Sequence, residues 1–479
     1  MIKRNSGLGF VALALSVSVP AFAAAPPVAN LADLGTAVSA QIACAGIFVA
    51  DRNEADVLRD DIHALAPFTQ KVTLTVDRKA RTVLASAPDA TPRTALYRPV
   101  AGCTLLTGDV STATLDAQVE GLAPLPAQSA RAWPLGDAAV PALQAAAEAK
   151  LDRAALDKAV AAAFDEQNKD GYPDTRAIVV VQGGAIVAER YAPGFDQNTE
   201  LLGWSATKSI MGTLVGILVD DGVLALDAPA PVPQWQGKGD PRAAITLRQL
   251  LTMTSGLAFV EKYEPGNDSI KMLFESGDMG AMAAELPLEH APGTHWSYSS
   301  GTTNILSRIA FQATGGTLQS MVRFAQERLF EPAGMTSALI EPDEAGVMMG
   351  SSYAYATARD WARYGVLHLN HGNAGGRQVL SQKWLDFAQT PTPVAPQPFY
   401  GAQLWLNVAE ADGERRKLFA DVPADAVMAR GHNFQIVASI PSQDAVIVRL
   451  GWTPEGHKFD WNKYVSQIAA ALAPATPTR

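Results

Sequence analysis

The sequence predicts an α+β fold in which a five-stranded antiparallel sheet is flanked by terminal helices and joined to a helical lobe. Two strands are expected early, at 177–181 and 185–188, around a Gly-Gly turn. Three more are expected late, at 403–408, 427–440 and 445–451. A helix-rich stretch over 205–387 separates the two groups, so the strands should meet in one sheet beside that lobe.

Helical spacing of apolar residues marks the two ends of this unit. Leu151, Leu156, Val160 and Phe164 recur at helical intervals before the first strand, and 461–472 forms a final helix. We therefore assign residues 133–479 to one domain. Residues 24–132 form a small α+β accessory region with a hairpin near 72–84, and an Ala- and Pro-rich linker over 121–141 joins the two.

The first 23 residues have the pattern of a signal peptide. Lys3 and Arg4 precede an apolar run over 7–19, and Ala21-Phe22-Ala23 offers small residues at the cleavage site. The alternative, a membrane anchor, is disfavoured because the run is shorter than the roughly 20 residues that span a bilayer. We expect an exported, periplasmic protein without a stable membrane anchor after cleavage.

The chain has two cysteines, Cys44 and Cys103, both in the accessory region. In an exported protein such a pair favours one disulfide, here closing a loop of about 60 residues and contributing roughly 4 kcal/mol. The alternative is a pair of buried free thiols.

Composition excludes several classes of function. Hydrophobic residues make up 48% and charged residues 18%, which is ordinary for a soluble enzyme, and the formal net charge of -10 argues against a nucleic-acid partner. The histidine pairs 368/371 and 290/295 lack the HExxH arrangement of a zinc site, so no metal is expected. No cofactor is implied either, and the oligomeric state stays open.

Ser205 and Lys208 are the first candidates for catalysis. Three residues apart on one helix, their hydroxyl and amine should come within hydrogen-bonding reach. A lysine whose pKa is lowered by burial can accept the serine proton and so create a nucleophile. In the alternative interpretation Ser205 caps the helix and Lys208 is solvated.

Two further stretches supply possible helpers. Tyr298 lies at a loop-to-helix junction, where a neighbouring ammonium would lower its pKa and let it act as general base or relay. Gly431, His432 and Asn433 lie on an expected strand whose backbone N–H, with that of Ser205, could form an oxyanion hole. The alternatives are a core tyrosine and a polar strand terminus.

Together these motifs resemble the serine hydrolases that share the penicillin-binding protein and class C β-lactamase fold, and most of all the branch of esterases and 6-aminohexanoate-dimer hydrolases. The resemblance covers about 146–472, and its motifs occur in the family's order: Ser205-Ala-Thr-Lys208, Leu250-Leu-Thr-Met-Thr-Ser-Gly256, Tyr298-Ser-Ser300, Ser352-Tyr-Ala-Tyr-Ala-Thr-Ala-Arg-Asp360 and Gly431-His-Asn-Phe-Gln435. It implies that Ser205 is acylated, that Lys208 is its base and that Tyr298 relays the proton. Tyr263 falls where the nylon-oligomer hydrolases place a tyrosine that contacts the substrate amide.

Two departures from the family pattern bear on the substrate. Ser300 stands where class C β-lactamases have Asn, and Gly431-His432-Asn433 replaces the Lys-Thr-Gly motif that helps hold a β-lactam carboxylate. We therefore expect a small ester or amide substrate. The alternatives are a D-Ala carboxypeptidase, a β-lactamase, or a non-catalytic recognition module.

Overall fold

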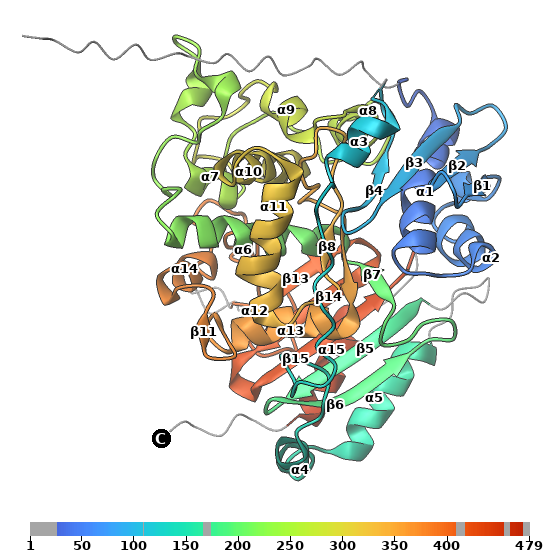
Figure 1. Ribbon diagram of the computed structural model, residues 1–479. Helices are drawn as coiled ribbons and strands as arrows, with labels where there is room; N and C mark the ends of the chain where they lie inside the picture. The colour runs from blue at the N-terminus through green and yellow to red at the C-terminus, as the bar shows by residue number, and fades with distance from the viewer. Residues whose placement is uncertain (1–25, 109, 166–173, 409–416, 455–459, 473–479) are drawn as a thin grey trace, which may run out of the picture.

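A computed structural model describes residues 26–108, 110–165, 174–408, 417–454 and 460–472. Its central feature is an antiparallel sheet in the order β12-β13-β14-β15-β5-β6, with the helical lobe on one side and the accessory region beside it (Figure 1). The strands are β5 (Thr175–Gln182), β6 (Ala185–Tyr191), β12 (Trp405–Leu406), β13 (Val427–Gly431), β14 (Gln435–Ile440) and β15 (Ala445–Gly451). The expected signal peptide lies outside the described residues.

The α+β class is confirmed, but the sheet has six strands where five were expected. The stretch 427–440 forms two strands because the chain reverses at His432–Phe434, where Asn433 and Phe434 take φ values of 53° and 63°. β13 and β14 then pair antiparallel. The stretch Arg430-Gly431-His432-Asn433 divides the apolar residues of this segment. Glycine and asparagine are typical of turns, and asparagine tolerates the left-handed conformation, so the sequence carried a turn signal that the prediction missed.

Helices cover both faces of the sheet. The terminal helices α5 (Arg153–Asp165) and α15 (Trp461–Ala471) pack together on one face, as expected. On the other face lies α13 (Ala358–Leu369), which contacts β5, β14 and β15. A small second sheet, in the order β7-β9-β8, adjoins it and has the bounds β7 (Glu200–Leu202), β9 (Ala354–Thr357) and β8 (Leu339–Ile340).

The helical lobe is built around α6 (Thr207–Asp220) and α10 (Ser300–Ala313), which pack against each other. The capping box expected at Thr246 and Gln249 is present and begins α7 (Leu247–Leu251). The other helices are α8 (Asp268–Glu275), α9 (Met279–Ala284), α11 (Leu318–Ala325), α12 (Glu331–Ala333) and α14 (Gln382–Ala388), and β10 (Asn373–Ala374) pairs with β11 (Arg377–Gln378).

The accessory region packs α1 (Leu31–Phe48) on a four-stranded sheet of β1 (Thr73–Asp77), β2 (Thr82–Ser86), β3 (Arg93–Arg98) and β4 (Gly102–Leu105). The hairpin and the disulfide between Cys44 and Cys103 are present as expected. Sequence reasoning missed α1, which by length and composition could cross a membrane, although 83% of it is buried inside the protein as in a core helix. Shorter helices are α2 (Glu54–Val57), α3 (Thr112–Ala117) and α4 (Pro141–Glu148).

The accessory region is joined to the lobe through buried polar contacts. The carboxylate of Glu341 accepts hydrogen bonds from the Cys103 amide at 2.7 Å and from Gln41 at 2.5 Å. Glu344 accepts a further pair from Thr107, both at 2.9 Å. Buried carboxylates without partners are costly, so these contacts bind the 341–344 segment to the disulfide-linked region.

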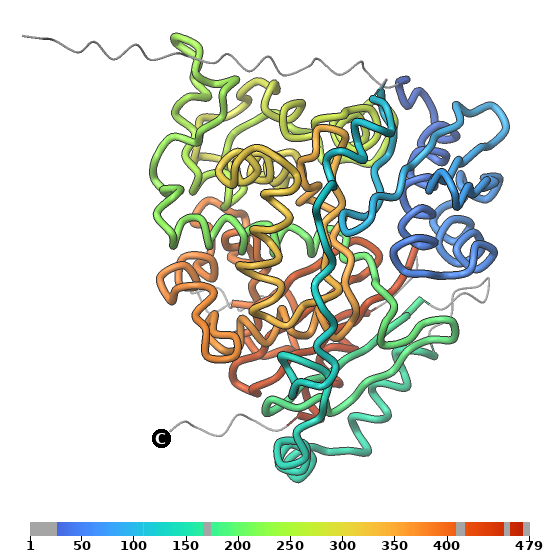
Figure 2. The backbone as a smooth tube through the Cα atoms, in the orientation of Figure 1, coloured from blue at the N-terminus to red at the C-terminus, as the bar shows by residue number. Residues whose placement is uncertain are grey.

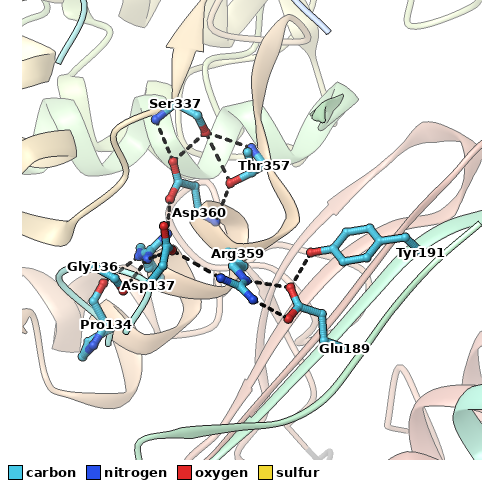
Figure 3. Close-up of polar contacts among 10 residues, drawn as sticks. Pro134, Gly136, Asp137, Glu189, Tyr191, Ser337, Thr357, Arg359 and Asp360 are labelled. Carbon is cyan, nitrogen blue, oxygen red and sulfur yellow. Dashed lines mark hydrogen bonds and ion pairs between the residues drawn. The ribbon is translucent and has the colours of Figure 1, made fainter. Parts of the chain in front are cut away.

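Residues 117–137, here called the strap, connect the two parts as an extended chain across the front of the molecule (Figure 2). Side chains of the lobe donate to backbone carbonyls of the strap at Ala117, Gly121 and Ala123. At its far end, the guanidinium of Arg363 donates to the carbonyls of Pro134 and Gly136. Nearby, Arg359 pairs with Glu189 (Figure 3). The strap, which includes most of the predicted linker 121–141, is thus held against the lobe at both of its ends.

Candidate active site

Ser205 lies in a short 3₁₀ turn, Trp204–Ala206, immediately before α6. The chain enters this turn through Trp204 at a φ of 47°, a conformation that costs a bulky residue energy and is typical of functional sites. Ala206 is the N-cap of α6 and no side chain caps that helix. The interpretation of Ser205 as a helix cap is therefore wrong.

Lys208 is buried, with 1% of its surface exposed, so it is not a solvated side chain. Its Nζ has three oxygen neighbours: Ser205 Oγ at 3.1 Å, Ser300 Oγ at 3.0 Å and the Ser351 carbonyl oxygen at 2.8 Å. The expected pairing of the hydroxyl and the amine is present, and two further oxygens hold the amine in place.

The pKa of Lys208 falls to about 8 because burial disfavours the ammonium. The nearby Glu261 carboxylate acts in the opposite direction and limits the fall. With that pKa about a tenth of the amine is neutral at pH 7, far more than for an ordinary lysine, and the neutral form can accept a proton as a general base must.

Tyr298 lies two residues before α10, whose N-cap Ser299 accepts a hydrogen bond from the Thr302 amide. Its ring centroid is 4.9 Å from Lys208 Nζ. Contrary to expectation, the pKa of Tyr298 is raised above its usual range, because burial outweighs hydrogen bonding with Ser205 and the charge of Arg430. The phenol stays protonated at neutral pH, so of the two groups Lys208 is the better candidate for a base, and Tyr298 could donate or relay a proton.

Glu261, a residue that sequence reasoning missed, connects Ser300 to Tyr263. The carboxylate of Glu261 accepts hydrogen bonds from the Ser300 amide at 2.7 Å, the Ser300 hydroxyl at 2.6 Å and the Tyr263 hydroxyl at 2.8 Å. Tyr263 is 52% exposed at the edge of this cluster. The sequence offered one indication of this role, since Glu261 lies two residues before the candidate Tyr263.

The stretch Gly431-His432-Asn433 lies beside the backbone that leads into Ser205. A Cβ added at Gly431 would lie 2.0 Å from the Gly203 carbonyl oxygen, so only glycine fits there. The exposed His432 ring packs edge-on against Trp204 at 5.4 Å. Asn433 is buried in the turn, and within the described chain neither polar atom of its side chain has a partner.

Two further residues position the cluster, and neither could be selected from its side-chain type. Ser351 contributes only its backbone carbonyl to Lys208 and is held by a 3.2 Å hydrogen bond from Asn304. Gln403 joins three elements: its carbonyl accepts from Ser209 on α6, and its side chain bonds Thr303 on α10 and the Leu251 carbonyl on α7.

Aromatic side chains line the Tyr298 side of the cluster. Tyr400 and Trp405 lie with ring centroids 5.9 and 5.7 Å from that of Tyr298. The guanidinium of Arg430 stacks over Trp405 at 5.0 Å. Tyr298 and Trp405 are half-buried, whereas Tyr400 is 2% exposed and packs in the core, so only the first two rings can offer apolar contact to a group next to Ser205.

Comparison with known proteins identifies the family. A family model described as Beta-lactamase matches residues 160–454, more than half of the chain. The chain belongs to this family. As a member of the β-lactamase family related to characterised hydrolases, it is a serine hydrolase.

Several relatives of this β-lactamase family member are hydrolases. It is 26% identical over 318 residues to a 6-aminohexanoate-dimer hydrolase of Paenarthrobacter ureafaciens, covering 61% of this chain and 76% of the relative. It is 30% identical over 208 residues to esterase EstB of Burkholderia gladioli, in a match that covers 39% of this chain and 52% of the esterase. Its fold is similar to that of a family VIII carboxylesterase crystal structure, with a TM-score of 0.52 and 18% identity. The match covers 67% of this chain and 96% of the carboxylesterase.

We expect Lys208→Arg to lower kcat/KM for a short-chain p-nitrophenyl ester by about 10³-fold or more, because a guanidinium stays protonated and cannot accept the serine proton. Lys262→Arg is the matched control, since Lys262 is exposed beside the site. Steady-state kinetics with both variants, checked for folding by circular dichroism, makes the comparison. Near-normal turnover by Lys208→Arg would rule out the lysine as base.

Proposed function

We propose that the protein hydrolyses a carboxylic ester or a small amide through an acyl-enzyme on Ser205. The observation that carries this proposal is the 3.1 Å contact between Ser205 Oγ and the buried Lys208 amine, whose pKa is about 8. A hydroxyl beside a base that is partly neutral near neutral pH is the arrangement that acyl transfer requires.

In the acylation step, Lys208 Nζ takes the Ser205 hydroxyl proton while Oγ attacks the substrate carbonyl carbon. The C–O bond that forms makes a tetrahedral intermediate whose negative charge lies on the former carbonyl oxygen. We assign its stabilisation to the Ser205 backbone N–H and an N–H at the end of β13, because Gly431 packs directly on Gly203.

Collapse of the intermediate breaks the bond to the leaving group, which must gain a proton. We assign that proton to the ammonium of Lys208, relayed through the Tyr298 phenol. The raised pKa of Tyr298 supports a role as donor, because the phenol is protonated when it is needed. Water then attacks the acyl-enzyme by the same steps in reverse, releasing the acid and restoring Ser205.

The substrate class rests on both relatives and residues. One relative is named as a hydrolase of 6-aminohexanoate dimer and another as an esterase. His432 and Asn433 stand in place of the Lys-Thr-Gly motif, which removes the lysine that would hold a β-lactam carboxylate. We therefore favour an uncharged ester or amide next to the half-buried rings of Tyr298 and Trp405.

The test is Ser205→Ala assayed in parallel with wild type on short-chain esters, linear amides and a chromogenic cephalosporin. We expect ester or amide turnover by wild type and a loss of about 10³-fold or more in the variant, with an acyl mass adduct on Ser205 only in wild type. Ser297→Ala, at an exposed serine nearby, is the control.

Each alternative predicts a different result in the same assay. Turnover retained by Ser205→Ala contradicts the mechanism. Faster hydrolysis of the cephalosporin than of any ester or amide favours a β-lactamase, and a long-lived penicilloyl adduct favours a carboxypeptidase. Labelling by a fluorophosphonate without turnover of any substrate favours a recognition module.

We infer that the protein is exported to the periplasm. Supporting this are the charged and apolar pattern of the first 23 residues and the disulfide between Cys44 and Cys103, which persists in oxidising compartments. Expressed in a Gram-negative host, the protein should be recovered from the periplasm with an intact mass that begins at Ala24. Recovery of the uncleaved chain from the cytoplasm alone would contradict export.

A further inference from the structure

The Lys208 amine has three oxygen neighbours, and these differ in whether they can donate a hydrogen bond or only accept one. An ammonium has three protons, and its three oxygen neighbours belong to Ser205, Ser300 and Ser351. When the lysine is neutral it keeps two protons and gains one lone pair, which must face one of these oxygens. Catalysis requires that it face Ser205, since only then can it receive the proton of the nucleophile.

The Ser351 neighbour is a backbone carbonyl, which only accepts, so it always takes one N–H of the lysine. The Ser300 neighbour is a hydroxyl, which could either accept an N–H or donate its own proton to the lone pair. If Ser300 donated, the lone pair would turn away from Ser205. The direction of proton transfer therefore depends on where the Ser300 proton lies.

Glu261 takes that proton. Its Oε1 accepts from the Ser300 hydroxyl at 2.6 Å, and its Oε2 accepts from the Ser300 amide at 2.7 Å. The carboxylate thereby binds Ser300 at two points and fixes its hydroxyl as a donor to Glu261 and an acceptor from Lys208. With the Tyr263 hydroxyl donating as well, the carboxylate has three donors and cannot release Ser300 without losing a short bond.

We propose that Glu261 is a positioning residue that, through Ser300, directs the lone pair of Lys208 at Ser205. The inference rests on the proposed roles of Ser205 and Lys208. It also accounts for Ser300 at the position where class C β-lactamases have asparagine, since a hydroxyl oriented by a carboxylate presents only acceptor lone pairs to the lysine.

The negative charge of Glu261 has a second effect, on the acidity of Lys208. The charged or titratable groups that face the amine are Glu261, from the segment after Leu257, and Tyr298, whose ring lies 4.9 Å away; Arg430 on β13 acts on Tyr298. Ser300 and Ser351 are uncharged. Of these groups, Glu261 alone raises the pKa of Lys208, so its removal should lower that pKa.

Glu261→Gln changes both the orientation of the Ser300 hydroxyl and the pKa of Lys208, and each change has its own readout in the pH profile. A glutamine can accept from the Ser300 amide and donate to the Ser300 hydroxyl, which frees the hydroxyl proton to occupy the lysine lone pair. We expect the pH-independent plateau of kcat/KM for a p-nitrophenyl ester to fall by about 10- to 100-fold. The acid limb of the profile should move to lower pH, because Lys208 loses its proton more readily without the carboxylate.

The experiment compares pH profiles of kcat/KM for wild type, Glu261→Gln, Ser300→Ala, the double variant, and Glu264→Gln as an exposed control in the same loop. We expect the double variant to be no slower than the slower single variant, because both residues act on one lysine. Glu264→Gln should have the same kcat/KM plateau and the same acid limb of the pH profile as wild type. Melting temperatures monitor folding throughout.

The outcomes distinguish this inference from the function on which it rests. If Ser205→Ala is inactive while Glu261→Gln keeps the wild-type plateau and limb, the role of Glu261 is wrong and the acyl-enzyme mechanism stands. Losses that multiply in the double variant, or a lower plateau with an unmoved limb, also overturn it. If Ser205→Ala retains turnover, the proposed function itself fails.

Discussion

Burial of a single amine is the constraint on which this site depends. Lys208 is withdrawn from solvent at the start of α6, and its pKa falls to about 8 because no protein charge fully replaces the lost hydration. Three oxygens compensate by accepting hydrogen bonds at 2.8 to 3.1 Å. The result is an amine that is neutral often enough to act as a base and is held in a defined orientation.

Each of those oxygens is positioned by a different part of the chain. Ser205 is carried by the 3₁₀ turn before α6, and Ser300 begins α10 under the control of Glu261. Ser351 ends a segment that starts at Glu341, whose carboxylate receives the amide of the disulfide-bonded Cys103. The accessory region is therefore connected, through the side chain of Glu341 and ten residues of chain, to the carbonyl oxygen closest to the Lys208 amine.

Much of this architecture follows from local sequence patterns, and the exceptions have physical reasons. The terminal helices could be predicted from helical spacing of apolar residues. The contact between Ser205 and Lys208 follows from their separation of three residues, although Ser205 lies in the 3₁₀ turn before α6, and their selection as candidates depended on the order of the family's motifs. The reversal at Asn433 was missed although Gly431 and Asn433 are residues typical of turns, because only the backbone shows that Asn433 and Phe434 both take left-handed φ values. Glu261 and Ser351 act through tertiary contacts, and a backbone carbonyl has no side-chain signature. The pKa of Tyr298 was predicted in the wrong direction because burial, which the sequence does not show, outweighs charge.

The central claim, that Lys208 is a base because it is buried, can be measured directly. Enzyme labelled with ¹³C at the lysine Cε positions gives one resonance that Lys208→Arg removes, and its chemical shift against pH reports the pKa of that amine. The account predicts titration near pH 8. Titration near 10.4, the ordinary value for lysine, would show that the amine is charged at neutral pH and would contradict it.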